Sequence, residues 1–319
     1  MELPVYWECG LDEDNNIYSI DNVNIEYDFY DIGTSICDLI LEKCRSLKNK
    51  YDLDDYWEKN NMLGVAKYWF AKDFIHFGKG IKIYLGSYCF MKDDTGKRTR
   101  SDVLPVMHIE INPNKYAREP VFVELLNFIK SFPSDSYLIK YDLAIDIRRT
   151  LDDVQIFSTK KSKSYFDNTR YYGKKNKNGR CKIYDKAKEQ NLDMVLTRVE
   201  HTLVCGAKNK NLSLEKVYFS VENSKPEDPL TENDMIIFKA LDRLRTAGLE
   251  YQDILDQVNF RKRKKIIAYM QNSGFKELQY DFAIIDGLLS KVRELFACVE
   301  LTEERFIPET VPDDDIPFE

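Results

Sequence analysis

Three carboxylate residues stand in two segments whose residue types are typical of β-strands. In "YLIKYDLAIDI" (137–147), Asp142, Ala144 and Asp146 are spaced two residues apart, so on a strand they share one face. Glu200 stands in a later segment of the same kind, "LTRVEHTLV" (196–204). Carboxylates on one face repel each other, and Mg²⁺ or Mn²⁺, which prefer hard oxygen ligands, would relieve the repulsion. The sequence therefore predicts a metal site of Asp142, Asp146 and Glu200; the alternative for each residue taken singly is a strand carboxylate that faces water.

A basic and tyrosine-rich segment, "TRYYGKKNKNGRCKIYDK" (169–186), lies between these two strands in the chain. The pKa of tyrosine is ordinarily about 10, so tyrosine becomes a useful nucleophile at neutral pH only where cations or a metal favour the phenolate. The cations around Tyr171 and Tyr172 could do this and could also hold a phosphate backbone. The two tyrosines point to opposite faces of a strand, so at most one can meet the metal. From the residues alone, packing in a core or an interface is the commoner role of a strand tyrosine.

The formal net charge of −7 conceals a separation of charge along the chain. Residues 1–60 carry −10 and residues 299–319 carry −7, whereas residues 61–298 carry +10. Within this middle part, residues 159–190 hold 11 bases and 3 acids, and residues 261–265 read RKRKK. Such segregation is typical of a face that binds a polyanion, although either basic run alone could be a solvated surface. The candidate nucleic-acid contacts are Arg170, Lys174, Lys175, Lys177, Arg180, Lys182, Arg261, Lys262, Arg263, Lys264 and Lys265.

Strand-like segments dominate up to about residue 205. The clearest are residues 23–29, 81–88, 106–112, 137–147 and 196–204, and apolar residues at helical spacing mark residues 35–47 and 121–132. We expect an α+β fold with a largely antiparallel sheet over residues 1–205, a mostly helical region over 206–300 and an acidic mobile tail over 301–319.

An internal duplication of the sheet is one interpretation of a weak echo in the sequence. A "YD" strand, a "YxG" strand and a strand with a glutamate follow one another twice. The first copy has Tyr27-Asp28, Tyr84-Leu85-Gly86 and Glu110, and the second has Tyr141-Asp142, Tyr171-Tyr172-Gly173 and Glu200. Matches this short also arise by chance, which is the alternative.

Helical signals follow residue 206. Thr231 and Asp234 form a capping box for a helix that ends at Gly248, and two further helical segments cover residues 249–258 and 259–272. Two short helices before a basic third helix predict a helix-turn-helix or winged-helix arrangement with residues 259–272 as the recognition helix. The alternative is a helical bundle whose basic helix faces water.

The order of these segments resembles the motif series of the Rep_trans family of replication initiators, which includes rolling-circle plasmid initiators and relaxases of integrative conjugative elements. "KYDLAID", "TRYYGKKNKNGRCKIYDK" and "LTRVE" are similar to that family's aspartate strand, T-x-Y-x-G strand, basic turn, I-Y-D-K strand and R-x-E strand. The resemblance covers residues 20–205. It implies a nicking enzyme in which a tyrosine attacks a phosphodiester at an origin, becomes linked to the 5′ phosphate and releases a 3′ hydroxyl.

The resemblance also implies a nucleophile and a metal site. Tyr171 falls on the tyrosine of T-x-Y-x-G, with Tyr172 as its rival. Asp142 and Glu200 fall on the acidic positions, with Asp146 as a helper, and these carboxylates would bind Mg²⁺ or Mn²⁺ to polarise the scissile phosphate.

Two cations of the motif series look like the family's cationic positions. Lys186 and Arg198 would stabilise charge on the transferring phosphoryl group. Their alternatives are salt bridges to Asp185 and Glu200. Lys174 departs from the small residue that usually follows the motif glycine, and an expected serine is absent, which concerns how DNA is positioned.

The end of the chain, "VPDDDIPFE", is similar to the acidic tip "DDDIPF" of bacterial single-stranded-DNA-binding proteins. That tip docks onto replication factors, so the similarity implies a partner-binding segment. Its residues are Asp313, Asp314, Asp315, Ile316, Pro317 and Phe318. The final Glu319 displaces the terminal carboxylate by one residue, and a solubilising acidic tail is the alternative.

Several classes of protein and site are disfavoured by the sequence. Seven scattered cysteines form no CxxC pair and three dispersed histidines form no zinc cassette, so we expect reduced, structural cysteines. Apolar runs stay below the about 18 residues that a membrane span needs, and the start of the chain lacks a signal-peptide pattern. We expect a cytoplasmic initiator that binds double-stranded origin DNA with a single-stranded or hairpin nick site, recruits a host helicase and, by family analogy, forms a homodimer. The alternatives are a conjugative relaxase with the same chemistry, a non-catalytic origin-binding protein and a DNA-binding module without a role in replication.

Overall fold

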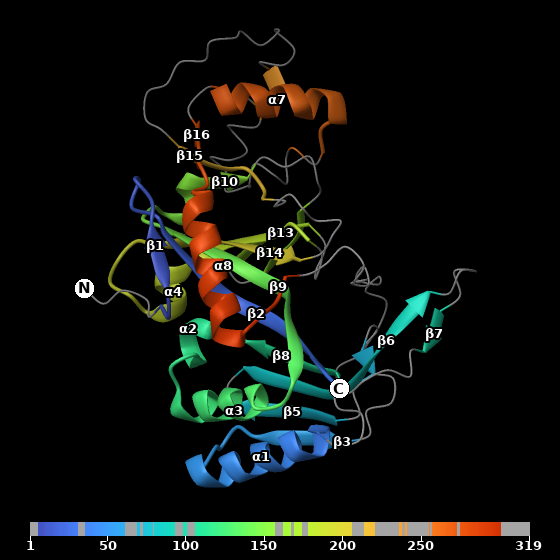
Figure 1. Ribbon diagram of the computed structural model, residues 1–319. Coiled ribbons are helices and arrows are strands. Elements are labelled where there is room, and N and C mark those ends of the chain that lie inside the picture. Colours follow the sequence, from blue (N-terminus) through green and yellow to red (C-terminus); the bar gives the residue numbers. More distant parts are fainter. Residues whose placement is uncertain are drawn as a thin grey trace.

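A large antiparallel sheet forms the body of the protein (Figure 1). The computed structural model describes residues 6–30, 36–60, 69–70, 73–78, 80–92, 98–100, 106–156, 162–166, 169–173, 178–205, 214–220, 236–237, 240, 255, 257–272 and 275–300. The sheet has 13 strands, and its main path runs β11-β12-β13-β14-β9-β2-β8-β6-β5-β3. β1 pairs with β2, while β4 and β7 pair with β6.

The elements of this sheet and its helices have the following bounds. The strands are β1 (Cys9–Leu11), β2 (Ile17–Phe29), β3 (Trp57–Asn60), β4 (Trp69–Phe70), β5 (Asp73–Gly78), β6 (Ile81–Lys92), β7 (Arg98–Arg100), β8 (Val106–Ile111), β9 (Ser134–Ile147), β11 (Ser162–Phe166), β12 (Thr169–Tyr172), β13 (Arg180–Asp185) and β14 (Thr197–Val204). The helices are α1 (Ile36–Tyr51), α2 (Pro113–Tyr116), α3 (Pro120–Lys130), α4 (Lys186–Gln190), α7 (Phe260–Asn272) and α8 (Phe282–Phe296), with a 3-10 turn at Leu151–Asp153. A separate three-stranded sheet joins β10 (Val154–Ile156), β15 (Val217–Ser220) and β16 (Phe275–Glu277).

The two faces of the large sheet differ in polarity because side chains alternate along each strand. In β13, "RCKIYD", Cys181 and Ile183 are fully buried in the apolar core, while Lys182 and Tyr184 point to the opposite face. Apolar side chains of α1, α3 and α8 belong to the same core. Helices therefore cover one face, and the polar side chains are left on the other.

The predicted α+β class and antiparallel sheet are confirmed. The strand segments predicted at 23–29, 81–88, 106–112, 137–147 and 196–204 fall in β2, β6, β8, β9 and β14, and the two predicted helices fall in α1 and α3. None of the helices in the described ranges combines the length and apolar character that crossing a membrane requires.

The predicted boundary at residue 205 divides segments that share one core. Leu288, Val292 and Phe296 of α8 lie in the core of the large sheet, and the Phe296 ring lies 6.2 Å from that of Phe122 in α3. Figure 1 shows α8 running across β2 and β9. The described part of 206–300 is also not purely helical, because β15 and β16 pair with β10. The apolar residues of α8 recur at helical spacing, and such spacing does not say which surface a helix packs against.

The pairing register of the sheet repeats on the two sides of the central β2–β9 pair. β2, β3, β5, β6 and β8 occupy the same places in one half as β9, β11, β12, β13 and β14 do in the other, in the same chain order. Lys82 lies opposite Glu110 in the first half, as Lys182 lies opposite Glu200 in the second. A duplicated sheet would show this arrangement.

The repeat in the register differs from the echo that the sequence predicts. Tyr84 stands two residues after Lys82, so its counterpart is Tyr184 rather than Tyr171. Glu110 lies opposite Asn24 and Glu200 lies opposite Ala144, so residues 22–26 correspond to residues 142–146. The counterpart of Asp142 is therefore Asn22 and not Asp28. Of the short sequence matches, Glu110 and Glu200 do correspond, the YD pairs fall on corresponding strands at different positions, and the YxG motifs fall on strands that do not correspond. Sequence matches carry no information on which strands pair.

Removing the aromatic ring of Phe296 tests whether α8 is part of the sheet's core. Phe296 is fully buried, so we expect Phe296→Ala to lower the free energy of unfolding by about 3–5 kcal/mol. Phe282→Ala is the matched control at the other end of the helix; Phe282 is 52% exposed, and we expect a change within about 0.5 kcal/mol. Urea unfolding monitored by circular dichroism measures both. An early, separate transition of α8 that leaves the sheet unaffected would contradict the shared core.

Candidate active site

A tyrosine, a lysine and a glutamate form a row across the polar face of the sheet, opposite the face on which α1, α3 and α8 pack. Lys182 on β13 lies opposite Tyr171 on β12 on one side and opposite Glu200 on β14 on the other. Neighbouring strands are about 4.8 Å apart, so the backbone positions of Tyr171 and Glu200 are separated by roughly 10 Å. The candidate nucleophile and one candidate metal ligand thus share a face, with a cation between them.

The two adjacent tyrosines have different environments. Tyr172 is 2% exposed and belongs to the apolar core, whereas Tyr171 is half-buried on the polar face. The guanidinium carbon of Arg180 lies 4.8 Å from the centre of the Tyr171 ring. Tyr171 is therefore the member of the pair that has access to the polar site, and a cation lies against it.

Glu200 is buried beside two other acidic groups and one cation. The Lys182 Nζ lies 2.5 Å from Glu200 Oε1, and the Tyr184 hydroxyl donates to Glu200 Oε2 at 3.4 Å. Burial raises the pKa of Glu200; Lys182 acts against this, Asp142 and Asp21 add to it, and the result is a pKa of about 7. Burial alone would lower the pKa of Lys182, but Glu200 and the two aspartates raise it above its usual value. This pair keeps a proton available near neutral pH.

Asp142, near Glu200, has a carboxylate oxygen without a hydrogen-bond donor among the described residues. It stands on β9 opposite Thr202, two residues along from the Ala144 that faces Glu200. Its Oδ1 is buried and has no hydrogen-bond partner in the described part of the chain. A buried carboxylate oxygen without a donor is destabilising unless a cation or another donor binds it.

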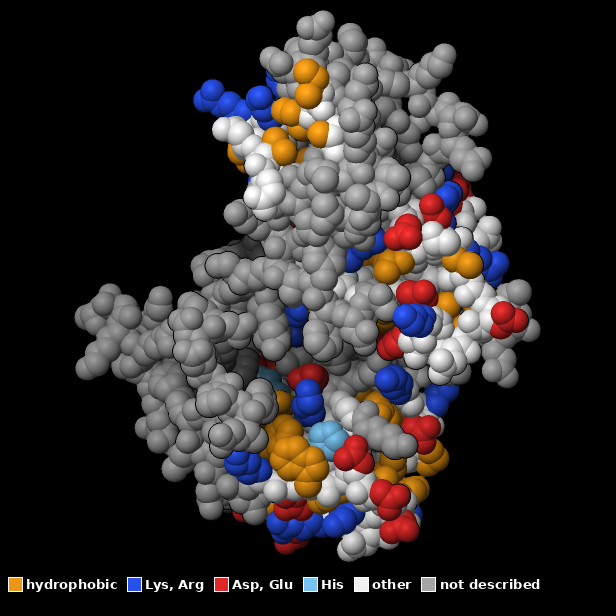
Figure 2. Space-filling view, turned by 180° about the vertical axis from the view of Figure 1, so that it is seen from behind, with side chains coloured by type: hydrophobic (Ala, Val, Ile, Leu, Met, Phe, Trp, Pro, Cys, Tyr) orange, Lys and Arg blue, Asp and Glu red, His pale blue; other side chains and the backbone are white. Residues whose placement is uncertain are grey.

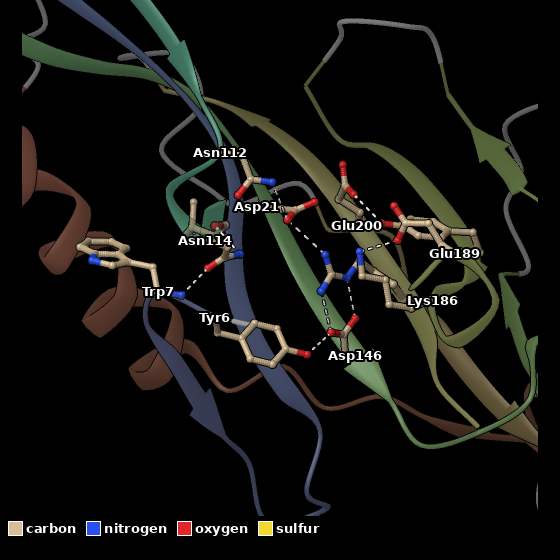
Figure 3. Close-up of polar contacts among 12 residues, drawn as sticks. Tyr6, Trp7, Asp21, Asn112, Asn114, Asp146, Lys186, Glu189 and Glu200 are labelled. Carbon is tan, nitrogen blue, oxygen red and sulfur yellow. Dashed lines mark hydrogen bonds and ion pairs between the residues drawn. The ribbon is translucent and has the colours of Figure 1, made fainter. Parts of the chain in front are cut away.

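Arg198 forms an ion pair with Asp146, the third of the predicted metal ligands. The Arg198 side chain is 2% exposed; its Nε and Nη2 donate to the two oxygens of Asp146 at 2.6 Å and 2.7 Å. The Tyr6 hydroxyl also donates to Asp146, and Arg198 Nη1 lies 3.1 Å from Asp21 Oδ1 (Figure 3). Both oxygens of Asp146 are thus occupied by the protein, and the predicted three-carboxylate site is not formed. No group of three or more His, Cys, Asp or Glu residues in the described ranges is placed to hold a metal ion.

Asp21 is a site residue that the sequence does not reveal. The pairing of β2 with β9 shifts between Ile20 and Asn22, so Asp21 stands at an irregularity of the strand. Asn112 Nδ2 donates to Asp21 Oδ1 at 3.0 Å. Burial acts to raise the pKa of Asp21, but Arg198, Lys186 and Asn112 lower it below its usual range. The period-two rule fails at a bulge, so no spacing signal could have placed Asp21 here.

Lys186 and Arg170 have partners within the protein. Lys186, 4% exposed at the start of α4, has its Nζ 2.5 Å from Glu189, while Asp185 caps α4 by accepting from the Lys188 backbone. Arg170 is 3% exposed and donates to the backbone oxygens of residues 151 and 154. Arg170 is buried and holds residues 151 and 154 in place, so its side chain is not accessible to DNA.

The basic helix α7 exposes most of its predicted contacts. Arg261, Lys262, Lys264 and Lys265 are exposed, whereas Arg263 is 6% exposed and donates to the Val258 backbone oxygen at 3.2 Å. The predicted helix over 259–272 is confirmed. The winged-helix arrangement stays a prediction, because most of residues 221–256 lie outside the described residues.

Two sets of predicted contacts fall outside the described residues. One comprises Lys174, Lys175 and Lys177 in the turn between β12 and β13. The other is the acidic end of the chain, residues 313–318. Gly173 and Gly179, which flank the turn, have φ of +88° and +75°, conformations that glycine adopts readily.

The donors that remain fit a metal held by few protein ligands. Mg²⁺ is commonly bound by one or two carboxylates together with water and substrate phosphate oxygens. Asp142, with its unpartnered oxygen, suits that pattern. Glu200 beside it suits the pattern only when a metal displaces Lys182 from Oε1 or the long Tyr184 contact from Oε2. Asp146 does not, because Arg198 holds both of its oxygens.

The raised pKa of Glu200 predicts how stability depends on pH. A carboxyl group whose pKa is higher in the folded state stabilises the fold at low pH, and this contribution is lost as pH rises through the folded-state value. The ordinary pKa of a glutamate is 4.5, and that of Glu200 in the folded protein is about 7. Between pH 4.5 and about pH 7, wild type should therefore lose stability relative to Glu200→Gln, by at most about 1.4 kcal/mol per pH unit. Urea unfolding of both proteins at several pH values measures the difference. A difference that stays constant with pH would show that Glu200 has an ordinary pKa.

Comparison with known proteins shows a distant similarity to a solved structure. No protein-family model matches the chain, and no curated protein matches it. Among solved structures, the chain is similar to the rolling circle replication initiator protein from Geobacillus stearothermophilus, with 14% identity and a TM-score of 0.32 over 59% of this chain and 74% of that chain. At this level of similarity, function is argued from the geometry of the site.

Proposed function

We propose that the chain is a replication initiator that binds an origin and nicks and rejoins one DNA strand through Tyr171. The observation that carries the proposal is the row of Tyr171, Lys182 and Glu200 on one face, with Asp142 beside Glu200. A nucleophile, cations for the phosphate and carboxylates for a metal are the components that phosphoryl transfer to a tyrosine needs.

The proposed reaction exchanges one phosphate ester for another. The Tyr171 hydroxyl oxygen attacks the phosphorus, so an O–P bond to tyrosine forms as the bond from phosphorus to the 3′ oxygen breaks. The tyrosine proton leaves to water and the departing 3′ oxygen takes up a proton. The products are a 5′-phosphotyrosine link and a 3′-hydroxyl primer, and the reverse reaction rejoins the strand.

The surrounding residues support this reaction in different ways. Arg180, against the Tyr171 ring, and Lys182, opposite it, would hold the phosphate and balance its negative charge. Asp142 and Glu200 would hold Mg²⁺ or Mn²⁺, which when bound polarises the scissile phosphate. Arg198 acts as a positioning residue, because it fixes Asp146 and Asp21 rather than reaching the substrate.

The proposed partners follow from the same chemistry. They are double-stranded origin DNA whose nick site is single-stranded or in a hairpin, a host helicase that enters at the nick, and a second copy of the chain in the cytoplasm. A conjugative relaxase would use the same residues on another DNA site. Neighbouring transfer genes and a coupling ATPase would identify that alternative.

Replacing the proposed nucleophile tests the reaction and the residue together. We expect Tyr171→Phe to reduce the covalent protein–DNA adduct by at least about 1,000-fold, because phenylalanine has no oxygen to attack phosphorus. The measurement is a denaturing gel of purified protein incubated with Mn²⁺ and supercoiled DNA of the element that carries the gene.

Tyr172→Phe is the matched control for this experiment. Its ring is in the core, so the variant keeps the packing and should form the adduct as wild type does. An adduct formed equally well by Tyr171→Phe would refute the assignment of the nucleophile. Wild type that binds the origin and never nicks would favour the non-catalytic origin-binding protein.

The exposed cations of α7 are proposed to bind the DNA backbone outside the nick site. Each phosphate contact contributes about 0.9 to the slope of log affinity against log salt concentration, so Lys264→Ala combined with Lys265→Ala should reduce that slope by about 2. Lys291→Ala on α8, also exposed, is the matched control and should leave the slope unchanged. Fluorescence anisotropy with a labelled origin duplex at several salt concentrations gives the slopes. Equal slopes for all three proteins would remove α7 from the DNA interface.

A further inference from the structure

The first half of the sheet repeats the register of the candidate active site with different residues. His76 lies opposite Lys82, as Tyr171 lies opposite Lys182. The Lys82 Nζ is 3.0 Å from Glu110 Oε1, which matches the Lys182–Glu200 pair. The first half therefore keeps the ion pair of the row but has an imidazole in the place of the nucleophile.

The acidic part of the site is also changed in the first half. By the repeat in the register, Asn22 stands at the place of Asp142. An amide has no negative charge, so it binds a divalent cation less strongly than a carboxylate does. With neither the tyrosine nor this carboxylate, the first half has no means of carrying out the strand transfer proposed for the second.

Aromatic rings occupy the first half instead. Trp57 on β3 lies opposite His76, and their rings are stacked with centroids 5.5 Å apart and planes 10° apart. The Trp57 ring also lies 5.1 Å from Phe74, which is 4.9 Å from Tyr84. The His76 Nδ1 is 3.1 Å from the Asp55 backbone oxygen, a contact that orients the imidazole beneath the indole. We call Trp57, His76, Phe74 and Tyr84 the aromatic platform.

The outer part of the aromatic platform is exposed and has cations near it. Trp57 is 49% exposed, whereas tryptophan side chains are on average largely buried. Lys59 is exposed and stands opposite Phe74, and the Lys82 side chain is 38% exposed. Figure 2 shows hydrophobic side chains, a histidine and Lys or Arg side chains close together, with Asp or Glu side chains among them, at the end of this face where Figure 1 places β3 and β5.

We propose that the aromatic platform binds an unpaired base of the same DNA strand whose phosphate lies at Tyr171. This inference rests on the proposed function. An exposed aromatic ring with lysines beside it is the chemistry that holds single-stranded DNA, because bases stack on the ring while cations contact the phosphates. The first half of the sheet then holds the strand that the second half cuts.

The distance between the two halves sets the length of strand required. Eight strand spacings separate β3 from β12 along the path of the sheet. At about 4.8 Å each, they span roughly 40 Å, which about twelve nucleotides cover at a rise of 3.4 Å. A strand of about 20 nucleotides can reach both Trp57 and Tyr171, whereas one of about six can reach only one of them.

Binding of oligothymidylates of these two lengths tests the proposal. The full chain with Tyr171→Phe, which cannot form the adduct, is titrated with dT20 and dT6 by fluorescence anisotropy. Loss of one stacked base weakens binding about 5- to 150-fold, so adding Trp57→Ala should weaken dT20 binding by that factor and remove most of the gain of dT20 over dT6. Trp57→Phe, which keeps an aromatic ring, should restore most of the affinity. The dT20 strand should also quench tryptophan fluorescence, and Trp57→Phe should lose that quenching.

Controls separate a lost base contact from a damaged fold. Phe282→Ala removes another exposed aromatic ring and should leave dT20 binding unchanged. Equal dT20 affinity with and without Trp57→Ala, or an equal loss of affinity for a duplex of the same length, would overturn the proposal. The protein could bind dT20 through Trp57 and yet wild type could never form the adduct. That result would support the base-binding platform and refute the nicking function, so the two failures are distinguishable.

Discussion

The antiparallel pairing of β2 with β9 determines what each face of this protein can do. Side chains alternate along a strand, so a slip of one residue between these two strands would exchange the core face with the polar face. The end of α8 stabilises the same pair: the Tyr27 hydroxyl on β2 and the Ser136 hydroxyl on β9 both donate to the Phe296 backbone oxygen. The Val299 backbone amide also donates to the backbone oxygen of Ser136 at 2.9 Å. Residues far apart in the chain thus fix the register on which the candidate site depends.

On the polar face, buried charges hold positions rather than add much stability. Removing water from Arg198 and Asp146 costs free energy that their bidentate pairing only balances, so an apolar pair of similar size would stabilise the sheet as well or better. Removing one partner is different, because it leaves a buried charge alone and costs about 3–5 kcal/mol. The pair therefore determines where charge lies: Arg198 binds both oxygens of Asp146 and holds Asp21 toward Lys182 and Glu200.

The sequence predicts those features that depend on periodicity and not those that depend on pairing. Alternation in 137–147 correctly predicts that Asp142, Ala144 and Asp146 lie on one face of a strand, whereas the position of Glu200 on the same face follows from its pairing with Ala144. It does not show that Arg198 lies directly opposite Asp146 and removes it from the site, because that requires the register of β9 with β14. Asp21 was missed for a related reason, since a bulge leaves no period in the sequence. The burial of Arg170 was also not predictable, because its partners lie in the 3-10 turn and in β10, and no pattern in the sequence places them beside β12.

The unequal halves of the sheet limit how one chain can carry out two strand-transfer steps. His76 stands at the register position of Tyr171, and Tyr84 stands at that of Tyr184, so the first half offers no tyrosine in the place of the proposed nucleophile. In the reaction proposed above, a Tyr171 that is linked to the 5′ phosphate cannot attack a second phosphodiester until that link is broken. Under this proposal a single chain could reverse its own cut by attack of the 3′ hydroxyl, whereas a second cut before release would require the Tyr171 of another copy. The proposal therefore makes the choice between rejoining and a second cut depend on how many copies are bound to the DNA.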